Sequence, residues 1–69
     1  MRQLSGGEFG HVLERHGWTL LRDHGSRRIY GKPGSMVRLS VPIHGHKPLE
    51  VQVLKHLLKM AGLTAQDLE

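Results

Sequence analysis

The chain has 69 residues, and a domain of this size buries only about 60% of the surface that its unfolded form exposes, so we expect one small domain, residues 1–69, with a thin core. Ten Lys and Arg against six Asp and Glu give a formal charge of +4, which favours a polyanionic partner. The lack of cysteine excludes disulfides and thiolate metal sites. The sequence has no apolar run of about 20 residues and no signal-peptide pattern, so we expect a cytoplasmic protein.

The first helix is expected at residues 5–16. Ser5 and Glu8 have the spacing of a capping box, in which each side chain accepts a hydrogen bond from the backbone N–H of the other residue. One helical face then carries Phe9, Val12, Leu13 and His16. Gly17 supplies the left-handed residue that often ends a helix.

From Trp18 onward the sequence has the character of strands. Residues 18–22 predict a first strand, residues 23–26 a turn, and residues 27–30 a second strand. A third strand is expected after the next turn, where alternation places three apolar residues on one face: Val37, Leu39 and Val41. We therefore expect three antiparallel strands, with Trp18 and Phe9 in the core.

A second helix is expected to begin at Pro48, because proline at the first helical position loses no hydrogen bond. Its buried face is formed by Val53 or Leu54, Leu57, Leu58 and Ala61. Lys55 and Lys59 lie on the opposite face, and Gly62 fits a left-handed helix end. Residues 64–67 favour one last short turn.

The order helix, three strands, helix predicts an α+β fold, with two helices on one face of a three-stranded antiparallel sheet and the other face open to solvent. This α-β-β-β-α order is that of the double-stranded-RNA-binding fold. A fold by itself does not establish what a protein does.

Two adjacent arginines, Arg27 and Arg28, stand where a turn enters the second strand. Guanidinium groups and free backbone N–H groups of the turn at Gly25 and Ser26 can meet one phosphate there, which predicts nucleic-acid binding. Tyr30 shares strand parity with Arg28, so we expect both side chains on the open face. There the ring could stack on a base, although a tyrosine that only covers the sheet surface is the commoner case.

Three lysines extend this predicted surface. Lys55 and Lys59 are one helical turn apart and, with Arg28 and Lys32, could follow a phosphate backbone; a solvated helix face is an equally good interpretation of the two helical lysines. The candidate nucleic-acid-binding residues are therefore Gly25, Ser26, Arg28, Tyr30, Lys32, Lys55 and Lys59. We expect no metal, since His44 and His46 lack a third ligand nearby, and no small-molecule cofactor.

Six separated motifs together resemble the HicA-type (YcfA-like) toxins over about residues 4–63. They are Gly17-Trp18, Gly25-Ser26, Tyr30 with Lys32-Pro33-Gly34, Val41-Pro42, His44-Gly45, and the helix from Leu54 that ends in Ala61-Gly62-Leu63. The resemblance implies a metal-independent mRNA interferase of a toxin–antitoxin pair, with mRNA as substrate and a HicB-type antitoxin as protein partner. It also implies a catalytic histidine directly after the Gly-Ser that opens the second strand.

This sequence has Arg27 at that position. RNA cleavage by the 2′-hydroxyl needs a proton acceptor near neutral pH, which an imidazole with a pKa of about 6.5 supplies and a guanidinium with a pKa above about 12 does not. Arg27 can still hold a phosphate or stabilise charge on it. We therefore expect a toxin that binds RNA but cleaves it poorly. His24, three residues earlier, is either a plain turn residue or a substitute base.

Two explanations for Arg27 stay open. Either a natural variant has lost or relocated its catalytic group, or a histidine was replaced so that a growth-arresting protein could be produced; the intact surrounding motifs favour replacement. The alternative function is a non-catalytic RNA-binding module, in which Arg27 and Arg28 serve affinity alone.

Overall fold

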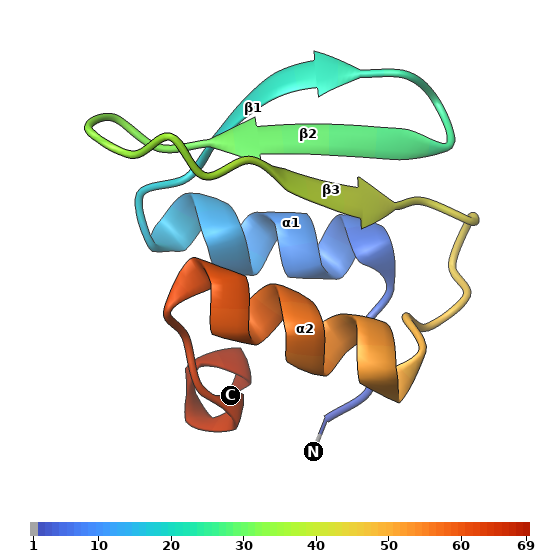
Figure 1. Cartoon of the computed structure of the whole chain (residues 1–69). Helices are drawn as coiled ribbons and strands as arrows, with labels where there is room; N and C mark the ends of the chain where they lie inside the picture. The colour runs from blue at the N-terminus through green and yellow to red at the C-terminus, as the bar shows by residue number, and fades with distance from the viewer. Residues whose placement is uncertain (1) are drawn as a thin grey trace.

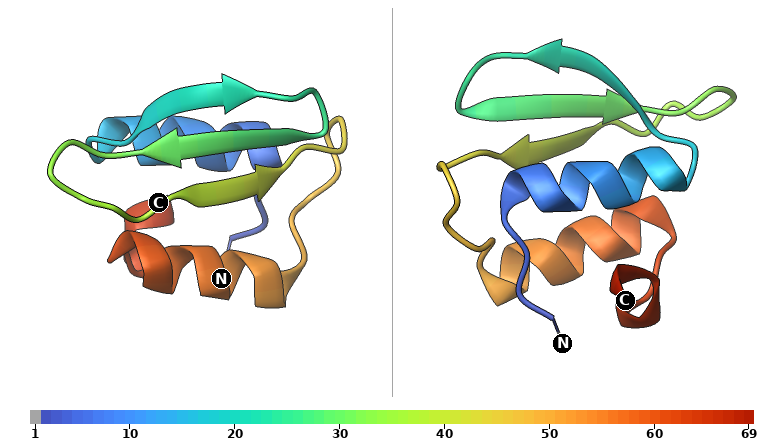
Figure 2. Two further views of the ribbon diagram at one scale, coloured as in Figure 1. Left: turned by 45° about the horizontal axis from the view of Figure 1, so that its top comes forward. Right: turned by 180° about the vertical axis from the view of Figure 1, so that it is seen from behind.

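The computed structural model describes residues 2–69 and has two helices on one face of a three-stranded sheet (Figure 1). The elements are α1 (Gly6–Arg15), β1 (Thr19–Asp23), β2 (Arg27–Gly31), β3 (Leu39–Pro42), α2 (Val51–Ala61) and the 3-10 helix η1 (Ala65–Leu68). The sheet is antiparallel with the strand order β1-β2-β3. Both helices lie on the same side of it, and the opposite face is bare (Figure 2). The predicted α+β fold is confirmed.

Helix α1 begins at the predicted capping box. The Ser5 N–H donates to Glu8 Oε1 at 2.9 Å, and the Glu8 N–H donates to Ser5 Oγ at 3.2 Å. These bonds satisfy two of the N–H groups that a helix start leaves unpaired. At the other end Gly17 has φ of 91°, the left-handed conformation predicted for it. Local sequence signals alone therefore set both ends of α1.

Helix α2 begins at Val51 rather than at Pro48, so the predicted start is wrong by three residues. Pro48 instead forms an isolated antiparallel bridge with Ser5. The next N–H, that of Leu49, donates to the Leu4 carbonyl at 2.7 Å. This pairing with the N-terminal segment keeps residues 48–49 extended, because a backbone in a bridge cannot also take helical dihedral angles.

The C-terminal end of α2 follows the prediction. Gly62 has φ of 72°, and the Leu63 N–H donates to the Leu58 carbonyl at 2.9 Å. The last short turn is η1, where the Thr64 N–H donates to Asp67 Oδ2 at 2.7 Å. No helix of residues 2–69 has the length and apolar character needed to cross a membrane.

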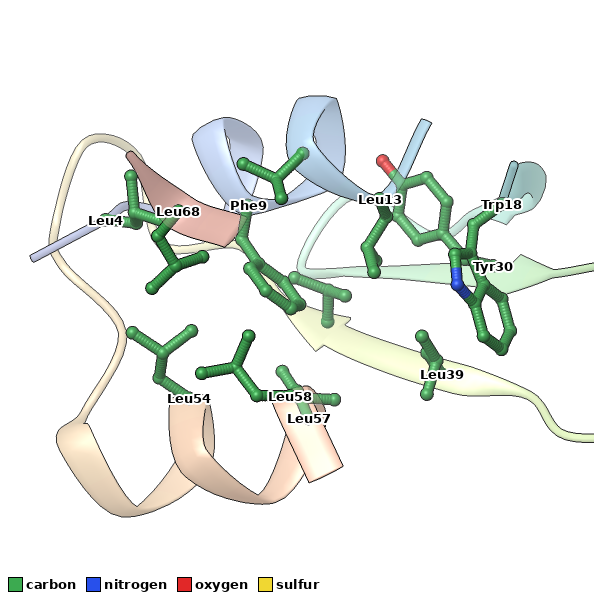
Figure 3. Close-up of a cluster of buried hydrophobic side chains, with 12 residues drawn as sticks. Leu4, Phe9, Leu13, Trp18, Tyr30, Leu39, Leu54, Leu57, Leu58 and Leu68 are labelled. Atoms are coloured by element: carbon green, nitrogen blue, oxygen red, sulfur yellow. The ribbon is translucent and has the colours of Figure 1, made fainter. Parts of the chain in front are cut away.

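The core lies between the sheet and the two helices (Figure 3). Its buried hydrophobic residues are Leu4, Phe9, Val12, Leu13, Trp18, Tyr30, Leu39, Val41, Leu54, Leu57, Leu58 and Leu68. Phe9 and Trp18 are core residues, as predicted. Val37, predicted on the apolar face of the third strand, is not a core residue. It precedes β3 in the loop of residues 32–38 and keeps 38% of its surface exposed. The apolar face of β3 therefore consists of Leu39 and Val41 alone.

Candidate functional site

Strand register separates the side chains of β2 into two sets. Arg28 is opposite Val41 and Tyr30 is opposite Leu39, and both of these β3 residues are buried under the helices. Directly paired residues point to the same side of a sheet, so Arg28 and Tyr30 face the helices. Arg27, with the opposite parity, points to the open face.

The predicted open-face position of Tyr30 is wrong. Its side chain is only 2% exposed, and its hydroxyl oxygen points at α1, where it contacts the position that a Cβ on Gly10 would occupy (Figure 3). Burial raises the pKa of this hydroxyl, with a smaller contribution from the charge of Glu14. A ring enclosed in this way has no free surface on which an RNA base could stack.

Arg28 is also on the helix side, so its predicted open-face position is wrong for the same reason. Its Nε lies 3.5 Å from Asp23 Oδ2 in an ion pair without hydrogen-bond geometry. Its Nη1 lies 3.8 Å from where a Cβ on Gly7 would be. Arg28 therefore links the end of β1 to the first turn of α1.

Arg27 is exposed on the open face at the start of β2. Its Nη1 donates a hydrogen bond of 3.0 Å to the hydroxyl oxygen of Ser40 on β3. Within residues 2–69 the close contacts between basic and acidic side chains join Arg28 to Asp23 and His11 to Glu14, and Arg27 belongs to neither. A guanidinium has five N–H donors, so most of those of Arg27 remain free for an anion.

The turn before Arg27 differs from the prediction in one respect. The Gly25 N–H donates to Asp23 Oδ1 at 2.9 Å, and the Ser26 N–H donates to the His24 carbonyl at 2.9 Å. Neither backbone N–H is therefore free for a phosphate, and the expected joint use of backbone and guanidinium is wrong. The Ser26 side chain is exposed beside Arg27, and His24 is exposed in the same turn.

Two of the three candidate lysines, Lys55 and Lys59, do not share a surface with Arg27. Lys32 directly follows β2, and its Nζ lies 5.6 Å from the centroid of the Trp18 ring in a cation–π contact. Lys55 and Lys59 are exposed on α2, which lies on the helix-covered side of the sheet (Figure 1), whereas the strand register places Arg27 on the open face. A phosphate that contacts Arg27 therefore cannot also contact Lys55 or Lys59.

Two other arginines share the open face with Arg27. Arg22 of β1 is opposite Ile29, which has the parity of Arg27. Arg38 lies over the far end of β2, and its Nη1 donates to the carbonyls of Ser35 and Val37 at 3.2 and 3.1 Å. Alternation in residues 37–41 indicates Arg38 on a polar face, but nothing in the sequence indicates how Arg22 pairs.

The open face is therefore strongly cationic. Asp23 is the only acidic residue in the three strands, and it pairs with Arg28 on the helix side. Arg22, Arg27 and Arg38 thus have no carboxylate beside them on these strands. Within residues 2–69, no three His, Asp or Glu side chains lie close enough together to hold a metal ion.

The family model described as "HicA toxin of bacterial toxin-antitoxin" matches residues 6–63, which run from the first residue of α1 to just beyond α2. A comparison with curated proteins gave no match. The matched family consists in general of RNA-cleaving toxins, each of which acts with a cognate antitoxin. This match covers most of the 69 residues and agrees with the motifs and with the α-β-β-β-α order. The chain belongs to the HicA toxin family of bacterial toxin–antitoxin systems.

Proposed function

We propose that this chain binds mRNA through the open face of its sheet, and that its endoribonuclease activity is impaired because Arg27 occupies the position of the catalytic histidine. One observation carries the proposal. The Arg27 guanidinium is exposed at the start of β2, outside the ion pairs of residues 2–69, with one hydrogen bond to Ser40. This exposure supports contact with a phosphate, whereas a guanidinium has no proton-accepting atom.

The electrostatics of the open face favour a polyanion. Arg22, Arg27 and Arg38 lie on it without a neighbouring strand carboxylate. Each arginine that neutralises a phosphate releases a condensed counterion, so RNA binding should weaken as salt rises. An mRNA substrate also implies that the protein acts in the cytoplasm.

The chemistry of position 27 separates binding from cleavage. During attack on the phosphate, the 2′-hydroxyl must lose its proton to a group with a free lone pair. Arg27 offers donors only, and the Ser40 hydroxyl oxygen already accepts one of them. The exposed His24 is the nearest residue in sequence that could act as a substitute base, so a residual activity should disappear in His24→Ala.

The antitoxin partner is proposed to be HicB-like and to cover the same face. A basic surface without carboxylates suits an acidic inhibitor that presents negative charge where RNA would bind. Competition between RNA and the antitoxin for the unaltered chain tests this point. Simultaneous binding of both would show that the antitoxin covers another surface.

The test of impaired catalysis is the substitution Arg27→His, with Arg27→Gln as the control that removes the charge without adding a base. We expect Arg27→His to raise the rate of RNA cleavage by about 10²- to 10⁴-fold, the usual contribution of a positioned acid or base. Growth arrest should appear in the same variant, and EDTA should have no effect. No gain in cleavage or growth arrest would show that position 27 is not catalytic here.

A second candidate is a non-catalytic RNA-binding module, favoured by the donor-only chemistry of Arg27. It predicts that Arg27→His binds RNA and releases no product. The same assay therefore separates an inactivated toxin from a binding module.

A further inference from the structure

A hollow of about 350 Å³ lies on the open face at the opposite end of β2 from Arg27. It is lined by Thr19, Leu21, Gly31, Lys32, Pro33 and Arg38. We propose that this hollow binds one unstacked nucleobase of a single-stranded RNA whose backbone contacts Arg27. The proposal rests on the proposed RNA-binding function and adds a base-binding site to it.

The hollow exists because β1 is irregular. The pairing register of β1 with β2 shifts between Leu20 and Arg22, which leaves Leu21 unpaired. Such bulges redirect a side chain, and here Leu21 lies over Gly31 on the open face. A Cβ on Gly31 would be 2.5 Å from Leu21 Cδ1 and 3.2 Å from Arg38 Nη1. Glycine therefore allows both side chains to lie close to the strand.

Arg38 forms a polar wall of the hollow and is oriented by hydrogen bonds to its own loop. Its Nη1 donates to the carbonyls of Ser35 and Val37, so the orientation of the guanidinium is set before a ligand arrives. A fixed side chain loses less conformational entropy on binding. Guanidinium groups stack on planar rings and donate to base acceptors.

The chemistry of the lining suits a nucleobase. Leu21 and Pro33 offer apolar surface to the face of a ring, and the Thr19 hydroxyl can donate to or accept from its edge. Bases in an A-form duplex are stacked and cannot enter such a hollow, whereas bases of a single strand can. The ligand is therefore an unpaired base.

The position of the hollow fits an RNA chain that also reaches Arg27. Gly31 and Arg27 have the same parity and are four residues apart, about 13 Å along a strand. A few nucleotides of an extended chain cover this distance. Arg22 lies beside the path, opposite Ile29, where it can contact an intervening phosphate.

The first test uses the unaltered chain and short single-stranded RNAs in which one abasic position is moved along the sequence. Base stacking on protein side chains contributes about 1–3 kcal/mol per base, so the abasic RNA that leaves the hollow empty should bind about 5- to 150-fold more weakly than intact RNA. The other abasic RNAs should bind almost as well as intact RNA. Fluorescence anisotropy at low salt measures the difference.

The second test compares Arg38→Ala with the matched control Arg15→Ala, which removes an equal charge from the exposed last turn of α1. We expect the penalty of the critical abasic RNA to disappear in Arg38→Ala and to persist in Arg15→Ala. Thermal melts establish that both variants fold. Arg38→Lys, which keeps the charge but not the planar group, should also lose most of the penalty.

Three results would overturn the proposal. If Arg27→Ala weakens RNA binding but no abasic position matters, RNA binds the open face without a base in the hollow. If Arg38→Ala weakens binding of the antitoxin only, the hollow is a protein contact. If no RNA binds at low salt, the proposed function fails and the base site fails with it.

Discussion

Two glycines in α1 provide a sharp test of how the helix packs on the sheet. Replacing glycine by alanine inside a helix normally stabilises a protein by about 0.5–1 kcal/mol. A Cβ on Gly7 would lie 3.8 Å from Arg28 Nη1, an ordinary contact. A Cβ on Gly10 would collide with the Tyr30 hydroxyl and lie 3.0 Å from Cζ of the ring.

The two substitutions should therefore have opposite effects. The Tyr30 ring is 2% exposed and cannot swing into solvent, so Gly10→Ala incurs an overpacking cost of about 1–3 kcal/mol. After subtracting the gain in helix propensity, the net loss is about 0–2.5 kcal/mol. Gly7 is in the first turn of α1 and meets no such contact, so Gly7→Ala should keep part of its gain. One kcal/mol corresponds to about 4–8 °C in Tm for a domain of this size.

Thermal and urea unfolding of both variants measures these changes. Tyr30→Phe removes the atom that the new methyl group meets, so Gly10→Ala should cost clearly less in a Tyr30→Phe background. Equal stabilisation by Gly7→Ala and Gly10→Ala, without coupling to Tyr30→Phe, would contradict the position of Tyr30 between α1 and the sheet.

Three further predictions follow from the core, the helix cap and the open face. Leu39→Ala removes a side chain that is 0% exposed and should cost about 2–5 kcal/mol in denaturant unfolding; a loss within 0.5 kcal/mol would contradict the core position. The Ser5 N–H donates to the Glu8 carboxylate and lowers the pKa of this group in the folded state. The contact therefore contributes fully to stability above the unfolded pKa of about 4.3, and the contribution is lost as pH falls through the lower folded pKa. Glu8→Gln should therefore reduce the acid dependence of Tm, and an unchanged profile would show that the cap does not titrate with folding. Arg27→Ala should lower the salt slope of RNA binding by about 1, whereas Lys59→Ala should leave it unchanged; the reverse pattern would place RNA on α2.

The parts of the fold that sequence predicted correctly depend on local chemistry. The Ser5–Glu8 capping box, the left-handed glycines at positions 17 and 62, and the hydrophobic face of α2 involve residues a few positions apart. The position of Arg27 at the start of β2 follows from the same kind of local pattern. The family resemblance added the expectation of a catalytic histidine at this position.

The predictions were wrong where contacts between residues far apart in the sequence determine the structure. Arg28 and Tyr30 do share one face, but pairing with Val41 and Leu39 determines that this face is the buried one. Pro48 would suit a helix start, yet its bridge to Ser5 keeps the chain extended.

Contacts between distant residues also determine which side chains form the candidate site. The hollow depends on a bulge at Leu21 and on the path of the loop before Arg38, and neither appears in the spacing of residues. The sequence predicts free backbone N–H groups at Gly25 and Ser26, but Asp23 and the His24 carbonyl accept hydrogen bonds from them. Sequence therefore predicted the cationic position and missed the surface around it.

The most direct test of RNA binding on the open face is an NMR titration of the unaltered, isotope-labelled chain with a short single-stranded RNA at low ionic strength. We predict that the side-chain Nε–H signals of Arg22, Arg27 and Arg38 move on binding, while the backbone signals of Lys55 and Lys59 on α2 stay in place. Signal changes confined to α2, with the Arg27 signal unchanged, would contradict RNA binding on the open face.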